Sequence, residues 1–366
     1  MVEWKKIGDV CTTNRGVRVI KKDLSQTGEF PVIQNSITPM GFYHKNNYDR
    51  NTPYVITAGA AGEVGYSEVP FWAADDCLCI QCHENILPKF VFLWLQEKQF
   101  ILKSQVRKGA IPRLSRTVVE GLVSPIPSLA EQERIVGVLD TFTKAIDNLK
   151  QQIELQRKKY AHYRDQLLDI EGKPSTDIHT WGEFSEMIKG NGVQKTDFVD
   201  EGIGCIHYGQ IYTHYGSFTY STNKFVSKET FDKARKASKG DIIMTDTSEN
   251  VEDICKSVAY LGAEDIAVSN HALIIKHQQN PKFLSYSTLT RSFFNQKRKV
   301  VVGVKVSGIK PVHLAQIKIY LPSLSEQQRI VGILDRFEAS ISNMEQQLSE
   351  RQKQYEYYRN KLLTFD

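Results

Sequence analysis

The sequence predicts a mixed α/β chain in which two globular domains are separated by two long helices that pair antiparallel. Two segments, 127–168 and 322–363, align without a gap and are identical at 22 of 42 positions, so the chain contains an internal duplication. Both segments carry an apolar heptad pattern, and each follows a longer stretch of globular composition. If the two copies pair with each other, an approximate two-fold axis relates the halves of the chain.

Each repeat copy is predicted to form one continuous helix. Ser128 with Glu131, and Ser323 with Glu326, fit a capping box, in which the hydroxyl accepts from the N3 amide and the carboxylate from the cap amide. At ~1.5 Å per residue each helix is roughly 55–60 Å long. Gly172 and Pro174 should stop the first helix.

Behind each cap, apolar residues alternate in steps of four and three. The mean spacing of 3.5 is typical of a coiled-coil seam, interrupted only at Gln156 and Arg351. Two unrelated amphipathic helices are the alternative, although heptads this long rarely serve one globular face. The predicted seam comprises Ile135, Leu139, Phe142, Ile146, Leu149, Ile153, Tyr160, Tyr163 and Leu167, and Ile330, Leu334, Phe337, Ile341, Met344, Leu348, Tyr355, Tyr358 and Leu362.

The repeats divide the chain into four segments: globular 1–126, helical 127–170, globular 171–321 and helical 322–366. Trp4 and Trp181 open the globular segments, and Gly16-Val17 and Gly192-Val193 follow them. Both segments end in a strand-like run that enters Pro-Ser-Leu. Between these anchors we find no usable similarity, which suits two modules with one frame and different ligands.

Composition narrows the class of protein. Hydrophobic residues make up 41% of 366, which is enough for substantial cores. No apolar run of about 18 residues predicts a membrane span, and the N-terminus lacks the apolar stretch of a signal peptide. We therefore expect a cytoplasmic protein with reduced cysteines and no membrane partner.

The net charge of +5 is unevenly distributed. The globular segments carry +3 each, whereas the helical segments carry 0 and −1. Stretches 98–119 and 266–325 contain bases but no acid, and both lie just before a repeat. Such stretches can neutralise DNA phosphates, although a solvated basic face is the alternative. The candidate phosphate contacts are Arg107, Lys108, Arg113 and Arg116, and Arg291, Lys297, Arg298, Lys299 and Lys305.

Polar and aromatic clusters could contact bases. Asn and Gln can grip adenine through two hydrogen bonds, and Arg or Lys can grip guanine. Ordinary polar loops are the alternative for any one cluster. The candidates are Gln34, Asn35, Lys45, Asn46, Asn47 and Arg50 in the first half, and His207, Tyr208, Gln210, Tyr212, Thr247, Asn250, Asn270 and His271 in the second.

Catalytic motifs are not apparent. Asn280-Pro281-Lys282-Phe283 lacks the second proline of an amino-methyltransferase strip, and we interpret it as a turn. The glycine-rich run 59–65 lacks the setting of a nucleotide loop, so a structural turn or a phosphate approach is expected. A zinc site is conceivable at the CxxCH run, but its first cysteines alternate as strand residues do, and we predict no metal. The residues concerned are Cys77, Cys79, Cys82 and His83.

The twice-occurring pattern PSLxEQxRIVGxLD…KxYxxYRxxLL resembles the two conserved regions of Type I restriction-modification specificity subunits. The resemblance implies that the globular segments are target recognition domains, each binding one half of a bipartite sequence in double-stranded DNA. It implies that the paired helices fix the spacer and dock two modification subunits, with restriction subunits joining outside them. S-adenosylmethionine would bind to the modification subunits, leaving this chain without cofactor or catalytic role. No base-contacting residues carry over, because these domains diverge.

Two other classes of function remain as alternatives. A coiled-coil scaffold that joins two protein-binding domains would explain the helices but not the paired basic stretches. An enzyme in its own right would need catalytic motifs that the sequence does not display.

Overall fold

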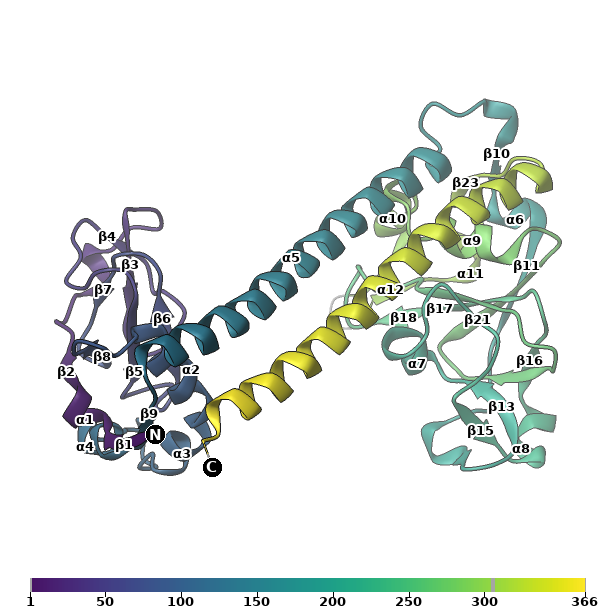
Figure 1. Cartoon of the computed structure of the whole chain (residues 1–366). Coiled ribbons are helices and arrows are strands. Elements are labelled where there is room, and N and C mark those ends of the chain that lie inside the picture. The colour runs from purple at the N-terminus through teal and green to yellow at the C-terminus, as the bar shows by residue number, and fades with distance from the viewer. Residues whose placement is uncertain (1, 304–306, 366) are drawn as a thin grey trace. The chain divides into compact units, whose positions relative to one another are not determined.

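The computed structural model describes residues 2–303 and 307–365, which form two compact units. Unit 1 comprises residues 1–151 and 346–366, and unit 2 comprises residues 152–345. Helices α5 (Leu129–Leu168) and α12 (Leu324–Leu363), of 40 residues each, contribute to both units (Figure 1). The prediction of one long helix per repeat is therefore confirmed. None of the described helices is long and apolar enough to cross a membrane.

The described part of unit 1 contains a four-stranded sheet, a three-stranded sheet and a two-stranded ladder. The larger is antiparallel, in the order β2 (Cys11–Arg15), β8 (Cys77–Cys82), β5 (Thr52–Ile56), β6 (Val64–Ser67). The smaller has the order β4 (Phe42–Tyr43), β3 (Phe30–Ile33), β7 (Trp72–Ala73), with β3 and β7 parallel. A short ladder pairs β1 (Glu3–Lys6) with β9 (Val123–Ile126), which leads into α5. The short helices are α1 (Ile7–Val10), α2 (Pro88–Glu97), α3 (Gln99–Ser104) and α4 (Arg116–Gly121), with a 3₁₀ turn at Lys21–Asp23.

Unit 2 repeats this plan with more strands. Its larger sheet has the order β11 (Ser185–Lys189), β21 (Ala272–His277), β17 (Ile242–Thr245), β19 (Ser257–Tyr260), β14 (Phe218–Thr219). Its second sheet has the order β12 (Phe198–Val199), β15 (Lys224–Val226), β13 (Ile203–Ile206), β20 (Ile266–Val268), β16 (Arg235–Ala237). Two ladders pair β10 (Ile178–Thr180) with β23 (Lys318–Tyr320), and β18 (Thr247–Ser248) with β22 (Ser307–Gly308). The short helices are α6 (Trp181–Phe184), α7 (Tyr208–Thr213), α8 (Lys228–Lys233), α9 (Pro281–Ser287), α10 (Arg291–Val300) and α11 (Pro311–Leu314), with 3₁₀ turns at Ser175–Asp177 and Lys195–Asp197.

The two globular parts thus share a strand order that the sequence did not disclose. The run β2-β8-β5-β6 in unit 1 corresponds to β11-β21-β17-β19 in unit 2, and the parallel pair β3–β7 corresponds to β13–β20. Helix and sheet are mixed in both parts, as predicted.

The predicted tryptophan anchor was wrong in register. Trp181 is fully buried at the start of α6, and its amide donates to Ile317 O at 3.0 Å. The residue with this role in unit 1 is Ile7, the first residue of α1, whose amide donates to Leu122 O at 2.9 Å. Trp4 is 56% exposed on β1, so it only resembles Trp181 in residue type.

The predicted glycine anchor was also wrong, by two residues. The amide of Gly16 donates to Cys77 O at 3.0 Å, and that of Gly190 donates to Ala272 O at 2.8 Å. Both carbonyls belong to the first residue of the neighbouring strand. Gly16 therefore corresponds to Gly190 and not to Gly192, because backbone pairing sets the register whereas side-chain identity at two positions does not.

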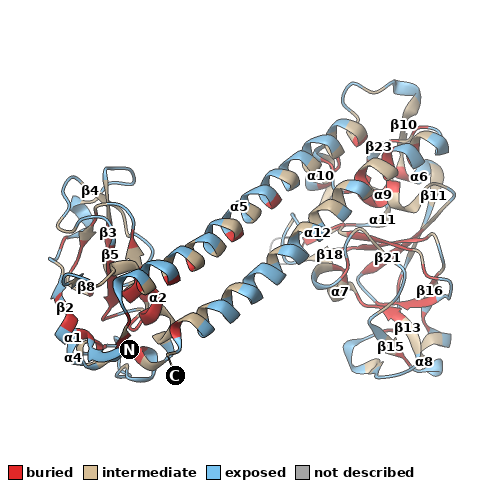
Figure 2. Ribbon diagram, viewed as in Figure 1, coloured by how far each residue is buried: buried red, intermediate tan, exposed pale blue. Residues whose placement is uncertain are grey.

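Both hydrophobic cores include residues of the long helices. In unit 1, Ile135, Leu139 and Leu363 are buried against α2, and in unit 2 Ile330 and Leu334 lie in the core with Trp181 and α9. Figure 2 shows buried residues in the sheets and along one side of α5, whereas α12 is buried only near its two ends.

The long helices pair antiparallel within each unit. Phe142 stacks on Tyr358 in unit 1, with ring centroids 5.2 Å apart, and Tyr163 stacks on Phe337 in unit 2, at 5.5 Å. Phe142 aligns with Phe337 and Tyr163 with Tyr358 in the two repeats, so the duplicated residues make the same contact in each unit. The predicted antiparallel coiled-coil helices are confirmed.

The helix caps are only half as predicted. The amide of Glu131 donates to Ser128 Oγ at 3.4 Å, and the equivalent Glu326–Ser323 bond has the same length. The Glu131 carboxylate, however, accepts two hydrogen bonds from Arg134, at 2.7 and 2.8 Å, instead of closing a capping box. A two-pronged guanidinium contact is stronger than one amide hydrogen bond.

Candidate nucleic-acid interface

Three loops of unit 2 converge on one cavity of about 800 Å³. They follow strands β13, β17 and β20, and they contain three of the polar clusters singled out in the sequence. A smaller hollow of about 380 Å³ adjoins the first and includes Asn270 in its lining. The predicted candidates in the larger cavity are His207, Tyr208, Gln210, Tyr212, Thr247, Asn250 and His271.

The parallel pairing of β13 with β20 explains this convergence. Parallel strands end at the same edge of a sheet, so the residues that follow them become neighbours. The amide of Ser269 donates to Ile206 O at 3.1 Å, and the amide of Tyr208 donates to Ser269 Oγ at 2.8 Å. His271 is held beside them in the left-handed region, with φ of +66°, a backbone conformation that costs energy in a non-glycine residue.

Gln34 and Asn35 occupy the equivalent position in unit 1, directly after β3. There the amide of Ala74, which follows β7, donates to Ile33 O at 2.8 Å. The amide of Ala60 in turn donates to Asn35 O at 2.9 Å, which brings the glycine-rich loop to the same edge. Both halves therefore place candidate residues at the carboxyl end of a parallel strand pair.

His207 presents a defined hydrogen-bonding face to the cavity. Its Nδ1 accepts from the amide of Gly209 at 3.1 Å, so the ring hydrogen resides on Nε2 when the imidazole is neutral. Burial, with Lys195 and His271 nearby, lowers the pKa of His207 below its usual value. A neutral imidazole with a fixed Nε2–H suits a base acceptor such as guanine N7 or thymine O4.

Other candidates shape the cavity with their own side chains. Gln210 accepts from the His207 amide at 2.7 Å and donates to Asn223. The Tyr212 hydroxyl donates to Thr247 O at 2.5 Å, and the two ends of the Asn250 amide bond Asp253 at 2.7 and 2.8 Å. These groups position the loops for their neighbours.

The charges around the cavity are mixed. Lys195 lines it, but so do Glu249 and Asp253. Asp246, which precedes the lining residue Thr247, has a buried carboxylate 3.0 Å from Lys189 Nζ. Carboxylates repel phosphate, so a wall with both signs is better matched to the donors and acceptors of base edges.

Two candidates are committed to other roles. The side-chain amide of Asn47 donates from Nδ2 to Ala73 O at 2.9 Å and accepts at Oδ1 from the Ala73 amide at 2.7 Å, so it holds β7 in place. Lys297 is 5% exposed, and its ammonium donates to Glu252 O and Ile254 O at 2.8 and 2.7 Å. Burial lowers the pKa of Lys297. We therefore leave both residues out of the proposed surface.

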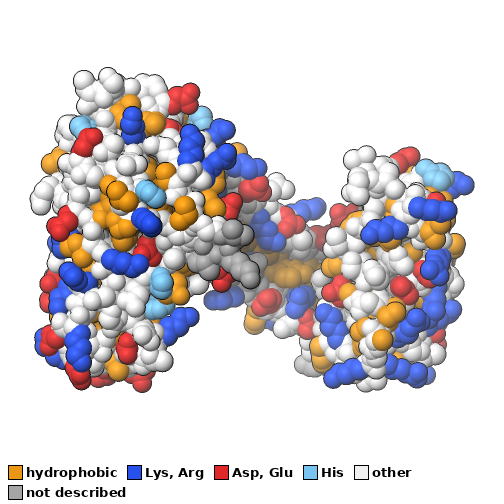
Figure 3. Space-filling view, turned by 180° about the vertical axis from the view of Figure 1, so that it is seen from behind, with side chains coloured by type: hydrophobic (Ala, Val, Ile, Leu, Met, Phe, Trp, Pro, Cys, Tyr) orange, Lys and Arg blue, Asp and Glu red, His pale blue; other side chains and the backbone are white. Residues whose placement is uncertain are grey.

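The remaining basic candidates are exposed. Arg291, Arg298 and Lys299 project from α10 into solvent, whereas Lys305 lies outside the described residues. In unit 1, Lys45, Asn46 and Arg50 are exposed on the loop between β4 and β5, and Arg107, Lys108 and Arg113 belong to an exposed hairpin. Arg116 is paired with Glu120 at 2.7 Å. On the face shown in Figure 3, Lys and Arg side chains are spread over both globular parts, with Asp and Glu side chains among them.

Some cavity residues were missed in the sequence. Lys195, Phe198 and Gln194 line the two hollows, yet they follow Gly192-Val193 without forming a conspicuous cluster. Only their position in the sequence, directly after Gly192-Val193, could have pointed to them, and the predicted equivalence of Gly192 with Gly16 was itself wrong.

The CxxCH run lies on strand β8 and the turn that follows it. Cys77 and Cys79 are fully buried, Cys82 Sγ lies 3.4 Å from Cys11 Sγ, and His83 Nε2 lies 3.2 Å from Thr12 Oγ1. Within the described residues, no group of three His, Cys, Asp or Glu side chains is placed to hold a metal ion.

Equivalent glutamines attach each long helix to its globular part. Gln132 accepts from the Leu87 amide at 2.8 Å and donates to Asn85 O and Pro127 O. Gln327 accepts from the Asn280 amide at 3.0 Å and donates likewise to two acceptors. Both glutamines are fully buried.

A lysine–aspartate pair also recurs beside these glutamines. Lys89 lies 3.8 Å from Asp140, and Lys282 lies 2.9 Å from Asp335. Each lysine follows a proline at the start of a helix. The interpretation of the segment that begins at Asn280 as a turn is therefore wrong, because this segment is the cap and first turn of α9.

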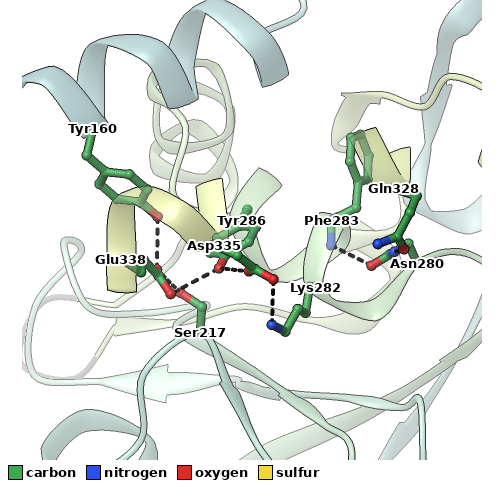
Figure 4. A network of polar contacts seen from close by, with 9 residues as sticks. All are labelled: Tyr160, Ser217, Asn280, Lys282, Phe283, Tyr286, Gln328, Asp335 and Glu338. Atoms are coloured by element: carbon green, nitrogen blue, oxygen red, sulfur yellow. Dashed lines mark hydrogen bonds and ion pairs between the residues drawn. The ribbon is translucent and has the colours of Figure 1, made fainter. Parts of the chain in front are cut away.

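In unit 2 this contact extends into a network (Figure 4). The Tyr286 hydroxyl, on α9, contacts Asp335 and Glu338 of α12 at 2.7 and 3.0 Å. Glu338 also accepts from Tyr160 of α5 at 3.0 Å and Ser217 at 3.3 Å. One carboxylate thus joins both long helices to the sheet of unit 2.

The profile of the Type I restriction modification DNA specificity domain matches residues 1–157 and 182–351. The specificity subunit of an Escherichia coli type I restriction enzyme is 25% identical, in an alignment that covers 100% of this chain and 94% of that protein. A type I restriction enzyme specificity subunit of Methanocaldococcus jannaschii is 23% identical over 75% of this chain and 69% of its own length.

Two solved structures share the fold. The S subunit of a type I restriction-modification system from M. genitalium superposes with a TM-score of 0.63 at 17% identity, covering 100% of this chain and 97% of that one. A chain from a structure of the type I R-M system, concerned with complex assembly and conformational transition, has a TM-score of 0.62 at 16% identity, with coverages of 100% and 98%. With two matched domains, this chain belongs to the family of Type I restriction-modification DNA specificity subunits.

Proposed function

We propose that this chain selects the DNA target of a Type I restriction-modification complex, with each globular part reading one half of a bipartite sequence. The observation that carries the proposal is the equivalent placement of candidate residues after β3 and after β13, with different side chains in the two halves. Two domains with the same fold but different side chains at the candidate site suit a target whose two halves differ in sequence. The polar, mixed-charge cavity of unit 2 supports base recognition, and the exposed basic residues support phosphate contact.

The paired helices would act as a ruler for the unread spacer and as the dock for two modification subunits. The duplication supports two equivalent docking faces, because Leu129 and Leu324 occupy matching positions and are both exposed, by 37% and 57%. The near-neutral charge of the helical segments favours a protein partner over DNA. Restriction subunits would join outside the modification subunits.

We infer that the chain itself catalyses no step. The absence of a methyltransferase strip from its sequence supports this, and S-adenosylmethionine would then bind to the modification subunits. Double-stranded DNA in the cytoplasm is the expected partner, which agrees with six cysteines that are all free thiols.

Single-molecule methylation sequencing of cells that express this chain with its modification subunit tests the proposal. We expect methyladenine at one bipartite motif, lost when this chain is deleted. If an expressed complex leaves no such motif and binds random DNA as tightly as any candidate sequence, the proposal fails in favour of a protein scaffold. Methyl transfer by the isolated chain would refute its non-catalytic role.

The ruler is tested by adding one heptad to α5 within residues 143–156 and one to α12 within residues 338–351. The recovered motif should then have a longer spacer and unchanged half-sites, because antiparallel helices lengthen together. A changed half-site with the original spacer would contradict the ruler. A control chain with the heptad in α5 alone should misalign the seam and prevent assembly.

A further inference from the structure

An exposed hairpin, residues 107–113, projects from unit 1. Arg107 and Arg113 form a backbone bridge of two hydrogen bonds, at 2.9 and 3.2 Å. The hairpin is fixed at its base, because the Leu114 amide donates to Thr57 O at 2.8 Å and the Gly59 amide donates to Pro112 O at 3.3 Å. All seven residues are exposed, whereas Leu114 is buried. The hairpin is thus anchored to the loop that follows the central strand β5.

The chemistry of this hairpin is unusual for a solvated surface. Its far end is apolar, with Ala110, Ile111 and Pro112 in sequence, and Ile111 is 57% exposed. Arg107 and Arg113 form the base of the hairpin, and Lys108 follows Arg107, so exposed cations flank the apolar end on both strands. A single exposed apolar residue needs no explanation, but one that is flanked by cations fits a partner with anions around an apolar interior. Duplex DNA has this arrangement, with phosphates outside and stacked bases inside.

Unit 2 has an equivalent anchoring bond. The Ile309 amide donates to Asp246 O at 3.0 Å, directly after β17, as the Leu114 amide donates to Thr57 O after β5. Next to Ile309, Gly308 forms a backbone bridge with Val302, with hydrogen bonds of 3.0 and 2.8 Å, and Val302 is 55% exposed. Strand β22, which contains Gly308, pairs with β18 (Thr247–Ser248), and β18 lines the cavity described above.

The position of the hairpin agrees with a role at the DNA. In unit 1 its base contacts Gly59, and the adjacent Ala60 bonds Asn35 at the edge where candidate base-contacting residues gather. No acidic residue occurs between 98 and 119, so nothing in this stretch of sequence opposes approach to phosphate. A protein partner would be expected to supply carboxylates to the same cations, and the test below separates the two cases.

We propose that the hairpin 107–113 inserts its apolar end, led by Ile111, between neighbouring base pairs while its three cations contact the flanking phosphates. Apolar wedges of this kind unstack a base step, and additional protein–DNA interactions along the bent duplex offset the cost of unstacking. This inference rests on the proposed function, and it adds a deformation of the target to the recognition of its bases. Specificity would then depend partly on how easily the inserted step unstacks.

The test uses the complex of this chain with its modification subunits, bound to duplexes that carry the recovered motif. 2-Aminopurine replaces one base at a time across both half-sites, because its fluorescence rises when it is unstacked. We expect a rise at one step of one half-site. Ile111→Ala should abolish the rise and weaken binding by about 10-fold, equivalent to ~1.4 kcal/mol, whereas Ile111→Leu should retain both.

Two further variants separate insertion from charge and from general surface change. Lys108→Gln should keep the fluorescence rise but lower the slope of log affinity against log salt by about 1, since one phosphate contact is lost. Val69→Ala removes another exposed apolar side chain of unit 1, 52% exposed and outside the hairpin, and should change neither quantity.

The outcomes distinguish this inference from the proposed function. If the unaltered complex binds no bipartite motif, the proposed function fails, and the inference with it. If it binds the motif without any fluorescence rise, or if Ile111→Ala behaves as Val69→Ala does, insertion alone is refuted. Loss of assembly with the modification subunits in Ile111→Ala would instead assign the hairpin to a protein contact and overturn the proposal.

Discussion

Tyr286 links α9 to α12 in unit 2, and its replacement by phenylalanine removes one hydroxyl from a fully buried position. The hydroxyl contacts Asp335 Oδ1 at 2.7 Å and Glu338 Oε2 at 3.0 Å. Burial and the two neighbouring carboxylates raise the pKa of Tyr286, so it stays a neutral donor throughout the accessible pH range. The substitution leaves the ring in place and creates almost no cavity.

The expected loss follows from what each carboxylate retains. A hydrogen bond to a charged group contributes about 1.5–3 kcal/mol. Asp335 keeps Lys282 at 2.9 Å, and Glu338 keeps Tyr160 and Ser217, so neither is left without a partner. The hydroxyl has one hydrogen, so its two contacts count as one shared hydrogen bond to a charged group, and Tyr286→Phe should lower the free energy of unfolding of unit 2 by about 1.5–3 kcal/mol.

Amide hydrogen exchange with peptide resolution measures this loss separately for each unit. A decrease of about 1.5–3 kcal/mol corresponds to exchange that is roughly 10 to 150 times faster in the most protected amides. We expect this acceleration in β17 and β21 but not in β5 and β8. Tyr220→Phe, at a residue 64% exposed, is the matched control. Equal exchange rates in the two variants, or equal acceleration in both units, would refute the reasoning.

Other residues give independent tests. Arg298→Ala should weaken DNA binding at all sequences and lower the slope of log affinity against log salt concentration by about 1. Lys297→Met should leave this slope unchanged, because the ammonium of Lys297 is buried. Equal slopes for the two variants in a salt titration would show that α10 faces away from DNA. Gln132→Ala should lower the free energy of unfolding of unit 1 by about 3 kcal/mol, and Gln327→Ala should lower that of unit 2 by the same amount, because each change leaves buried hydrogen-bonding partners unpaired. Faster hydrogen exchange in the other unit would contradict this. Burial lowers the pKa of His277 to about 4, so protonation favours unfolding, and unit 2 should lose up to ~3 kcal/mol as pH falls from about 6.5 to 4. Between about pH 6.5 and 4 the urea midpoint of a His277→Gln variant should vary less than that of the unaltered chain. An equal pH dependence in both would exclude His277 protonation as the cause.

The sequence by itself determined the repeat-based parts of this protein. The long helices, their start at Ser128 and Ser323 and their pairing follow from a local period of 3.5 and from two copies identical at 22 of 42 positions, which need no knowledge of distant contacts. The antiparallel direction of the pairing was implied by the family resemblance. The hydroxyl half of each cap was also predictable. The carboxylate half was not, because a neighbouring arginine competes for the same group.

Only the tertiary structure decided how the globular halves correspond and which candidates are available. The anchors matched by residue type alone, Trp4 with Trp181, proved out of register, since backbone pairing over long sequence separations sets equivalence. Lys297 looked like its exposed neighbours until carbonyls of a loop some 45 residues away were found at its ammonium. The cavity of unit 2 exists because β13 and β20 pair in parallel across about 60 residues, and no local pattern encodes that pairing.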